Sequence, residues 1–392
     1  MQQFDFDRII DRRGSHSYKY DGLKKIFGRE DVLPMWVADM DFAVPPAVQE
    51  AIRRRAEHPI YGYTFRPDEY YKSIVNWIGR RHGWRVEREW IRYSPGIVPA
   101  INMAVQGFTE PGDGVILQSP VYHPFFYAIN LNHRKVLNNP LREENGYYTF
   151  DLDDLAEKAK EAKLLLLSNP HNPVGRSWDE VELRQLGEIC VENDVLIVSD
   201  EIHADLTLPG HRHVPLASLS EEIAAHTITC MAPSKTFNLA GLSTSSVIIP
   251  EEKLRERFEE VVESLHIGGG NLFGIEASIA AYNHGDAWLD ALLEYVQGNV
   301  DYARTFLAGK MPEVTLSPVE ATYLLWLDFR RTGMDAETLK RFMTEEAKVG
   351  GNDGAMYGPG GEGFVRLNVA CPRTVVEEAF ERIYNAWIKH RS

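Results

Sequence analysis

The chain contains few cysteines and no long apolar segment. Its three cysteines are far apart and form no C-x-x-C pair, so neither a disulfide scaffold nor a structural zinc site is expected. The longest purely aliphatic run covers residues 164–167, too short to span a bilayer. The first twenty residues lack the apolar core of a signal peptide. These absences predict a cytoplasmic protein with no membrane partner.

The chain also lacks an excess of positive charge. Its 42 Lys and Arg residues stand against 57 Asp and Glu residues, which gives a formal net charge of −15. Binding to nucleic acids or to anionic membranes depends on clustered basic side chains, so neither is expected. A small anionic ligand in a local basic pocket remains compatible with this composition.

No repeat, low-complexity tract or long linker divides the 392 residues, although a chain of this length predicts two domains. Short apolar runs alternate with helical patterns between about residues 85 and 250, which is typical of a mostly parallel sheet covered by helices. The runs lie at 114–118, 163–168, 195–199 and 227–231. A capping box of Ser177 and Glu180 predicts the start of the helix between the second and third strands.

The C-terminal part has a different pattern. Apolar runs predict strands at 321–329 and 363–369, and a capping box of Thr374 and Glu377 predicts a helix over 374–390. We therefore expect an α/β protein with a large domain, 48–288, and a smaller α+β domain made of 1–47 and 289–392. The N-terminal segment is expected to pack on the smaller domain or on a second subunit.

Three polar residues follow predicted strands at the point where each strand ends. Asn172, Asp200 and Lys235 should meet at one edge, because ligands of open α/β sheets bind beyond the carboxyl ends of the strands. A lysine amine can form a Schiff base, and enzymes that use pyridoxal phosphate (PLP) pair such a lysine with a carboxylate at the pyridinium nitrogen. Taken singly, each has a strong structural interpretation, namely a turn residue, a helix cap and a surface lysine, so the prediction rests on their combination.

Longer motifs around these residues resemble a known family. The segments 168–175 (SNPHNPVG), 199–203 (SDEIH) and 232–241 (APSKTFNLAG) are similar to fold-type I PLP enzymes of the aminotransferase class I/II superfamily. The segments 34–42 (PMWVADMDF) and 357–368 (YGPGGEGFVRLN) resemble its cystathionine β-lyase, or carbon–sulfur lyase, subgroup. The resemblance runs from about residue 5 to 385. It implies cleavage of cystathionine or related cysteine thioethers to a thiol, pyruvate and ammonia.

The resemblance also implies a role for each matching residue. Lys235 corresponds to the Schiff-base lysine that also moves the Cα proton, Asp200 to the partner of the pyridinium nitrogen, and Asn172 to the donor to the ring oxygen. Tyr122 corresponds to the tyrosine that stacks on the ring. His203 belongs to the same cofactor set.

The implied phosphate site follows a predicted short strand at 90–93. The backbone amides of Ile97 and Val98 and the hydroxyl of Ser234 are expected to bind the phosphate, because free N–H groups at a helix start favour anions. Tyr61 is expected to reach it from the neighbouring subunit of a homodimer. Arg366 should bind the substrate carboxylate, which a guanidinium can grip with two hydrogen bonds.

Two positions depart from the family pattern. Many relatives carry an arginine eight residues after the lysine, where this chain has Ser243, so the phosphate would depend more on amides and hydroxyls. The segment 350–355 (GGNDGA) differs from the subgroup and lies near the expected substrate entrance, so it bears on substrate choice.

Three other functions compete with the lyase. A metal hydrolase could use a group of carboxylates and histidines, although their spacing matches no H-E-x-x-H motif: Asp200, Glu201, His203, Asp205, His211 and His213. A second possibility is a PLP-binding protein with a mainly regulatory role. A third is an aminotransferase, which shares the Schiff base and Cα–H removal and differs only in the fate of the carbanion.

Overall fold

The computed structural model describes residues 4–391. Its centre is a seven-stranded sheet in the order β2-β10-β9-β8-β7-β3-β4, and β10 is the one strand that runs antiparallel to its neighbours. The strands are β2 (Ile91–Ser94), β3 (Gly114–Leu117), β4 (Lys135–Asn138), β7 (Ala162–Ser168), β8 (Leu196–Asp200), β9 (Thr227–Met231) and β10 (Ser245–Ile248). The mostly parallel sheet predicted from the apolar runs is confirmed.

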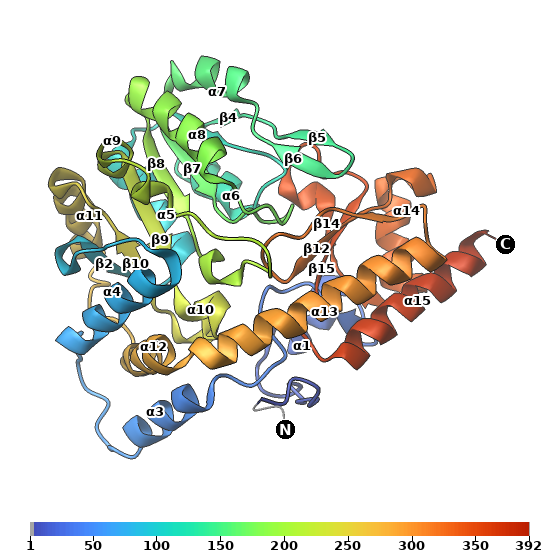
Figure 1. Ribbon diagram of the computed structural model, residues 1–392. Coiled ribbons are helices and arrows are strands. Elements are labelled where there is room, and N and C mark those ends of the chain that lie inside the picture. Colours follow the sequence, from blue (N-terminus) through green and yellow to red (C-terminus); the bar gives the residue numbers. More distant parts are fainter. Residues whose placement is uncertain (1–3, 392) are drawn as a thin grey trace.

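Strand β7 shows why these runs form buried strands. Side chains alternate between the two faces of a strand, and in β7 both faces are apolar. Leu164 and Leu166 join a core cluster that includes α5 (Ile97–Phe108) and α11 (Glu252–Ser264). Leu165 and Leu167 join a second cluster that includes α7 (Leu152–Ala159) and α8 (Glu180–Glu192). Helices therefore cover the sheet on both sides, as Figure 1 shows.

A second, antiparallel sheet lies in the C-terminal part of the chain. Its order is β11-β12-β15-β14, with β11 (Thr315–Leu316), β12 (Leu324–Asp328), β14 (Asn352–Asp353) and β15 (Phe364–Asn368). Two long helices, α13 (Asp286–Lys310) and α15 (Arg373–Arg391), pack against each other beside it (Figure 1). The short helix α14 (Ala336–Arg341) leads into a π-helical turn, η6 (Phe342–Glu346).

The N-terminal segment packs on this C-terminal part. Strand β1 (Leu33–Pro34) pairs in parallel with β13 (Val349–Gly350), and Asn368 Nδ2 donates hydrogen bonds of 2.6 Å to the carbonyls of Val37 and Asp39. This is one of the two places that the sequence left open for the segment. The division into 48–288 and 1–47 with 289–392 stays a prediction.

Three helices form a further layer near the large sheet. Helix α12 (Leu272–His284) packs against α3 (Pro46–Ala56) and α4 (Asp68–His82), and residues 57–67 between α3 and α4 loop away from the body in Figure 1. None of the helices in the described part of the chain is long and apolar enough to cross a membrane.

Two predicted helix starts are wrong. Helix α8 is capped by Asp179, whose side chain accepts from Glu182 N while the Glu182 side chain accepts from Asp179 N. Ser177 instead donates its hydroxyl to Arg212 O. Helix α15 begins at Arg373, so Thr374 lies inside the first turn and cannot cap it.

Candidate active site

The carboxyl ends of β7, β8 and β9 open into a cavity of about 220 Å³. Ser168 ends β7, Asp200 ends β8, and the short helix α10 (Pro233–Thr236) directly follows β9. The cavity is lined by eight of the ten residues predicted for the site: Ile97, Val98, Tyr122, Asn172, Asp200, His203, Ser234 and Lys235. Asn172, Asp200 and Lys235, the three residues expected to meet beyond the strand ends, therefore do lie around one cavity, and the roles of the eight residues stay predictions.

Lys235 lies where this cavity meets a larger one. Both cavities are lined by Lys235, Tyr122 and Ala38. The Nζ of Lys235 donates a 2.6 Å hydrogen bond to the carbonyl oxygen of Ala38. The pKa of Lys235 is lowered to about 8, mainly by burial; the charge of Arg366 acts in the same direction, and the charges of Asp39 and Asp200 oppose it. The amine is thus easier to deprotonate than a surface lysine.

Asp200 is a buried carboxylate with little local compensation. Its side chain accepts a hydrogen bond of 3.2 Å from the backbone N–H of Ile202, and within residues 4–391 it forms no ion pair. Burial raises the pKa of Asp200 to about 7, although Ile202 N–H and the charge of Lys235 act in the opposite direction. A cationic group in the cavity would stabilise its charged form.

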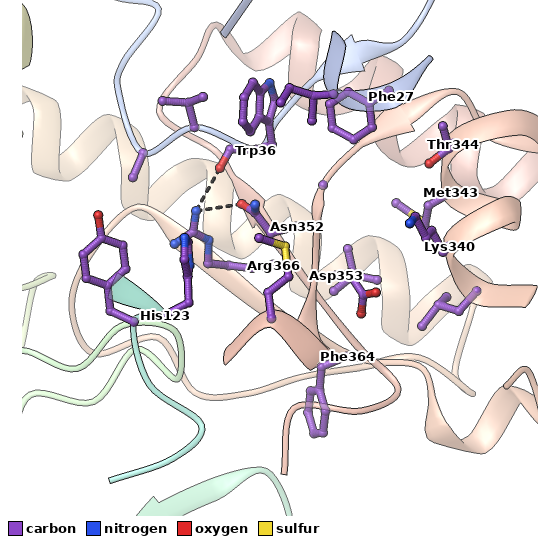
Figure 2. Close-up of a pocket in the computed structure, with 18 of the residues that line it drawn as sticks. Phe27, Trp36, His123, Lys340, Met343, Thr344, Asn352, Asp353, Phe364 and Arg366 are labelled. Carbon is purple, nitrogen blue, oxygen red and sulfur yellow. Dashed lines mark hydrogen bonds between the residues drawn. The ribbon is translucent and has the colours of Figure 1, made fainter. Parts of the chain in front are cut away.

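Arg366 lines the larger cavity and is held by three hydrogen bonds. Its Nη1 donates to Asn172 Oδ1 at 2.9 Å, and its Nη2 donates to Trp36 O and Asn352 Oδ1, both at 2.8 Å (Figure 2). Asn352 lies opposite Arg366 in the β14–β15 pairing. The Nε of Arg366 is buried and has no hydrogen-bond partner among the described residues. A buried donor without a partner is costly, so this edge of the guanidinium is prepared for an anionic ligand.

The N-terminus of α5 forms another wall of the smaller cavity. The first amides of a helix have no partner within the helix, and at the start of α5 these are the amides of Ile97 and Val98. Ser234, Ser243 and Thr244 also line the cavity. Amides at a helix start together with hydroxyl groups suit a phosphate.

Tyr122 and His203 complete the polar lining. Burial raises the pKa of Tyr122, and the charge of Asp200 adds to this effect, so the phenol stays neutral. Burial lowers the pKa of His203 to about 3, with smaller contributions from the cations Lys235 and Arg366. The Nδ1 of His203 has no hydrogen-bond partner among residues 4–391. Its ring lies edge-on to Tyr323, 6.2 Å between centroids.

Tyr61 is the one predicted residue that lines neither cavity. It is 60% exposed, and its hydroxyl donates to Ala56 O at 2.9 Å. Ile60, Tyr63 and Phe65 in the same loop are also exposed large apolar side chains. A single chain therefore does not place Tyr61 at the site.

In the carboxylate and histidine group considered for a metal hydrolase, Glu201 and Asp205 each contact one histidine, and the histidine at Asp205 comes from outside the group. His213 Nε2 contacts Glu201 Oε2 at 2.7 Å, and His82 Nε2 contacts Asp205 Oδ1 at 2.9 Å. Across the described range, no three such side chains are arranged to hold a metal ion.

Several lining residues were not found from the sequence. Trp36 and Asn352 hold Arg366 through tertiary and cross-strand contacts, and neither residue was predicted for the site. His123, next to Tyr122, lines the larger cavity with a buried Nδ1 that lacks a partner within the described range. Burial lowers the pKa of His123 to about 4, so it is a neutral polar group. Its adjacency to Tyr122 was the available signal.

Comparison with known proteins identifies the class to which this fold and site belong. Residues 30–383 match the model of the family "Aminotransferase class I and II", and the chain belongs to that family. Cystathionine beta-lyase PatB of Bacillus subtilis is 47% identical over 382 residues, covering 97% of this chain and 98% of PatB.

Two solved structures are closely similar. Cystalysin of Treponema denticola, which contains a pyridoxal 5′-phosphate cofactor, has a TM-score of 0.95 at 38% identity, covering 99% of this chain and all of the other. A PLP-bound C-S lyase of Staphylococcus hominis complexed with L-cycloserine has a TM-score of 0.92 at 36% identity, covering 98% of this chain and 99% of the other.

Proposed function

We propose that this protein is a PLP-dependent carbon–sulfur β-lyase that cleaves cystathionine or related cysteine thioethers to a thiol, pyruvate and ammonia. The observation that carries the proposal is the position of Lys235 between two cavities, one lined by Asp200 and the other by Arg366. The first has the groups that a cofactor needs, and the second has the cation that an amino-acid substrate needs. The relatives named as lyases support the same chemistry.

The residues of the smaller cavity fit PLP. Asp200 is a buried carboxylate without an ion pair in the described part of the chain, and a pyridinium nitrogen facing it would supply the missing positive charge. The unpartnered Nδ1 of His203 is available to a polar group of the cofactor. The amides of Ile97 and Val98, with Ser234, would hold the phosphate. Ser243 and Thr244 also line this cavity and add hydroxyl groups to it.

Each residue then has a defined part in the reaction. PLP, when bound, supplies an electron sink that stabilises negative charge at the substrate Cα. Lys235 would hold the cofactor and then take the Cα proton on Nζ, for which a pKa near 8 suits a base working near neutral pH. Tyr122 would stack on the cofactor ring, and Asn172 would donate from Nδ2 while its Oδ1 keeps its bond to Arg366.

Arg366 would fix the substrate by its α-carboxylate. Because Asn172, Trp36 and Asn352 hold the guanidinium, little side-chain entropy remains to be lost on binding. With the carboxylate fixed, the Cα–H bond would lie in a cavity that Lys235 also lines. Departure of the thiolate from Cβ completes the elimination, and the remaining three-carbon fragment hydrolyses to pyruvate and ammonia.

The proposal includes a homodimer in the cytoplasm, with Tyr61 reaching the phosphate of the neighbouring subunit. The exposed apolar side chains around Tyr61 support burial of this loop against a second copy. We also propose the division into the large domain, 48–288, and the small domain, 1–47 with 289–392.

The deciding experiment is incubation of the purified protein with L-cystathionine and PLP, without any keto-acid acceptor. We expect pyruvate and free thiol in equal amounts over many turnovers. Lys235→Ala is the control and should form neither. If the wild type forms neither product but transfers an amino group to added keto acids, the protein is an aminotransferase.

A further inference from the structure

The larger cavity extends well beyond Arg366. It has a volume of about 480 Å³ and continues from Lys235 and Arg366 to α14 and η6. Its walls are largely apolar in this outer part, where Ile26, Phe27, Met343 and Met356 line it. Arg366 needs only the α-carboxylate of a substrate, so the outer part is available to the group attached to the sulfur.

Two charged side chains of opposite sign line this outer part. Asp353 lies on β14, next to the Asn352 that holds Arg366, and Lys340 lies in the last turn of α14. In the view of Figure 2, Asp353 lies between Arg366 and Lys340. The Asp353 carboxylate accepts a hydrogen bond from Ala355 N at 3.0 Å. Within residues 4–391 neither Asp353 nor Lys340 forms an ion pair, so both charges are available to a ligand.

We infer that Asp353 and Lys340 form a subsite for a second α-amino-acid head, carried by the leaving group of the thioether. Its ammonium would face Asp353 and its carboxylate would face Lys340, while the apolar walls contact the chain between the two heads. The inference rests on the proposed lyase function and narrows its substrate class. The preferred substrate carries two zwitterionic heads. A cysteine thioether with a plain alkyl leaving group would leave the charges of Asp353 and Lys340 without a partner on the substrate.

This assignment gives the segment 350–355 a role in substrate binding. The segment differs from the subgroup pattern in its sequence, and it was expected to bear on substrate choice. Within it, Asn352 fixes the guanidinium that binds the first head, and Asp353 lines the space for the second. Adjacent residues of β14 thus act at the two heads of the substrate. Their fixed separation would help to set the distance between the heads that the site accepts.

The test compares two substrates on holoenzyme variants. Asp353→Asn keeps an oxygen that can accept from Ala355 N, and Lys340→Gln removes only the charge. Each should lower kcat/KM for L-cystathionine about fivefold, as expected for partly solvated ion pairs, and change kcat/KM for S-ethyl-L-cysteine less than twofold. The matched controls are Glu337→Gln and Arg341→Gln, which remove the same charges from exposed residues of α14 that do not line the cavity. Equal losses on both substrates, or no loss on either, would overturn the assignment.

A binding measurement separates this inference from the proposed function. L,L-2,7-Diaminosuberate has two amino-acid heads and no sulfur to expel, whereas L-norleucine has one head. We expect competitive inhibition by diaminosuberate to weaken about fivefold in Asp353→Asn and Lys340→Gln, with norleucine unaffected. If no thioether is cleaved, inhibition of whatever reaction the enzyme performs still reports the subsite. Equal inhibition constants in wild type and variants would contradict it.

Discussion

Thr236, the residue that follows Lys235, donates a 2.7 Å hydrogen bond from its hydroxyl to Oδ2 of Asp205. The other oxygen of Asp205 accepts from Trp77 Nε1 and contacts His82 Nε2, both at 2.9 Å. Burial by itself would raise the pKa of Asp205, but the contacts with His82, Thr236 and Trp77 hold it below its ordinary value. A charged carboxylate therefore ties α10, which carries Lys235, to α4.

We expect Thr236→Val to displace Lys235 as well as to destabilise the protein. The substitution keeps the shape and leaves Asp205 with one donor fewer, which should cost about 1–3 kcal/mol of unfolding free energy. The value of kcat should fall while the KM for thioethers changes little, because Arg366 is untouched. Thr236→Ser keeps the hydroxyl and should restore kcat. A Ser variant as slow as the Val variant would contradict a positioning role.

Replacing Arg366 by Lys should raise KM for every thioether about a hundredfold. An ammonium cannot keep the bonds to Asn172, Trp36 and Asn352 and still present a donor pair to a carboxylate. Arg330→Lys is the control, since Arg330 is a more exposed arginine that pairs with Asp328 beside β15. Steady-state kinetics on S-ethyl-L-cysteine measures the change in KM, because this substrate has no second head to contact Asp353 and Lys340. An unchanged KM would remove Arg366 from substrate binding.

The sequence predicted the strands well because fully buried strands are continuous apolar runs. The expected segment 227–231 coincides with β9, and the segments at 114–118 and 163–168 differ from β3 and β7 by one residue at one end. The segments at 90–93 and 195–199 lie one residue before β2 and β8, and β4 and β10 were not predicted. The predicted cap of α8 failed because two capping patterns overlap and Ser177 is engaged in tertiary contacts. Ser177-x-x-Glu180 and Asp179-x-x-Glu182 are overlapping capping patterns, and a tertiary bond from Ser177 N to Glu320 decides between them.

The site was predictable where its residues follow strands and was missed where tertiary contacts supply them. Asp200 ends β8, and Asn172 and Lys235 lie four residues beyond the ends of β7 and β9, so topology brings the three together. The partners of Arg366 come from positions 330 and 14 residues away, through a backbone carbonyl at Trp36 and through the β14 register at Asn352. No local pattern encodes such a pair of contacts.

The apoprotein should lose stability between about pH 4 and pH 7 because of Asp200. Its pKa is raised to about 7 in the folded state from an ordinary value of 3.8, so in this interval the unfolded chain has released a proton that the folded chain retains. Unfolding free energy therefore falls as pH rises, by up to about 4 kcal/mol from this residue. Asp200→Asn should remove that dependence. The measurement is urea unfolding of both apoproteins from pH 4.5 to 7.5, and parallel curves would refute the expectation.

Tyr61→Phe tests whether the neighbouring subunit completes the cofactor site. In the single chain the Tyr61 hydroxyl donates to Ala56 O, and this hydrogen bond is exposed to solvent. Such a bond is easily exchanged, so the hydroxyl could donate to a phosphate when the loop packs on a second copy. A lost hydrogen bond to a phosphate should weaken PLP binding about tenfold or more. Tyr63→Phe is the matched control from the same exposed loop. Fluorescence titration of the apoproteins with PLP gives the dissociation constants, and sedimentation shows whether the variants keep the same assembly. Equal affinities in wild type and Tyr61→Phe, with assembly unchanged, would mean that the phosphate is held by one chain through Ile97, Val98 and the neighbouring hydroxyls.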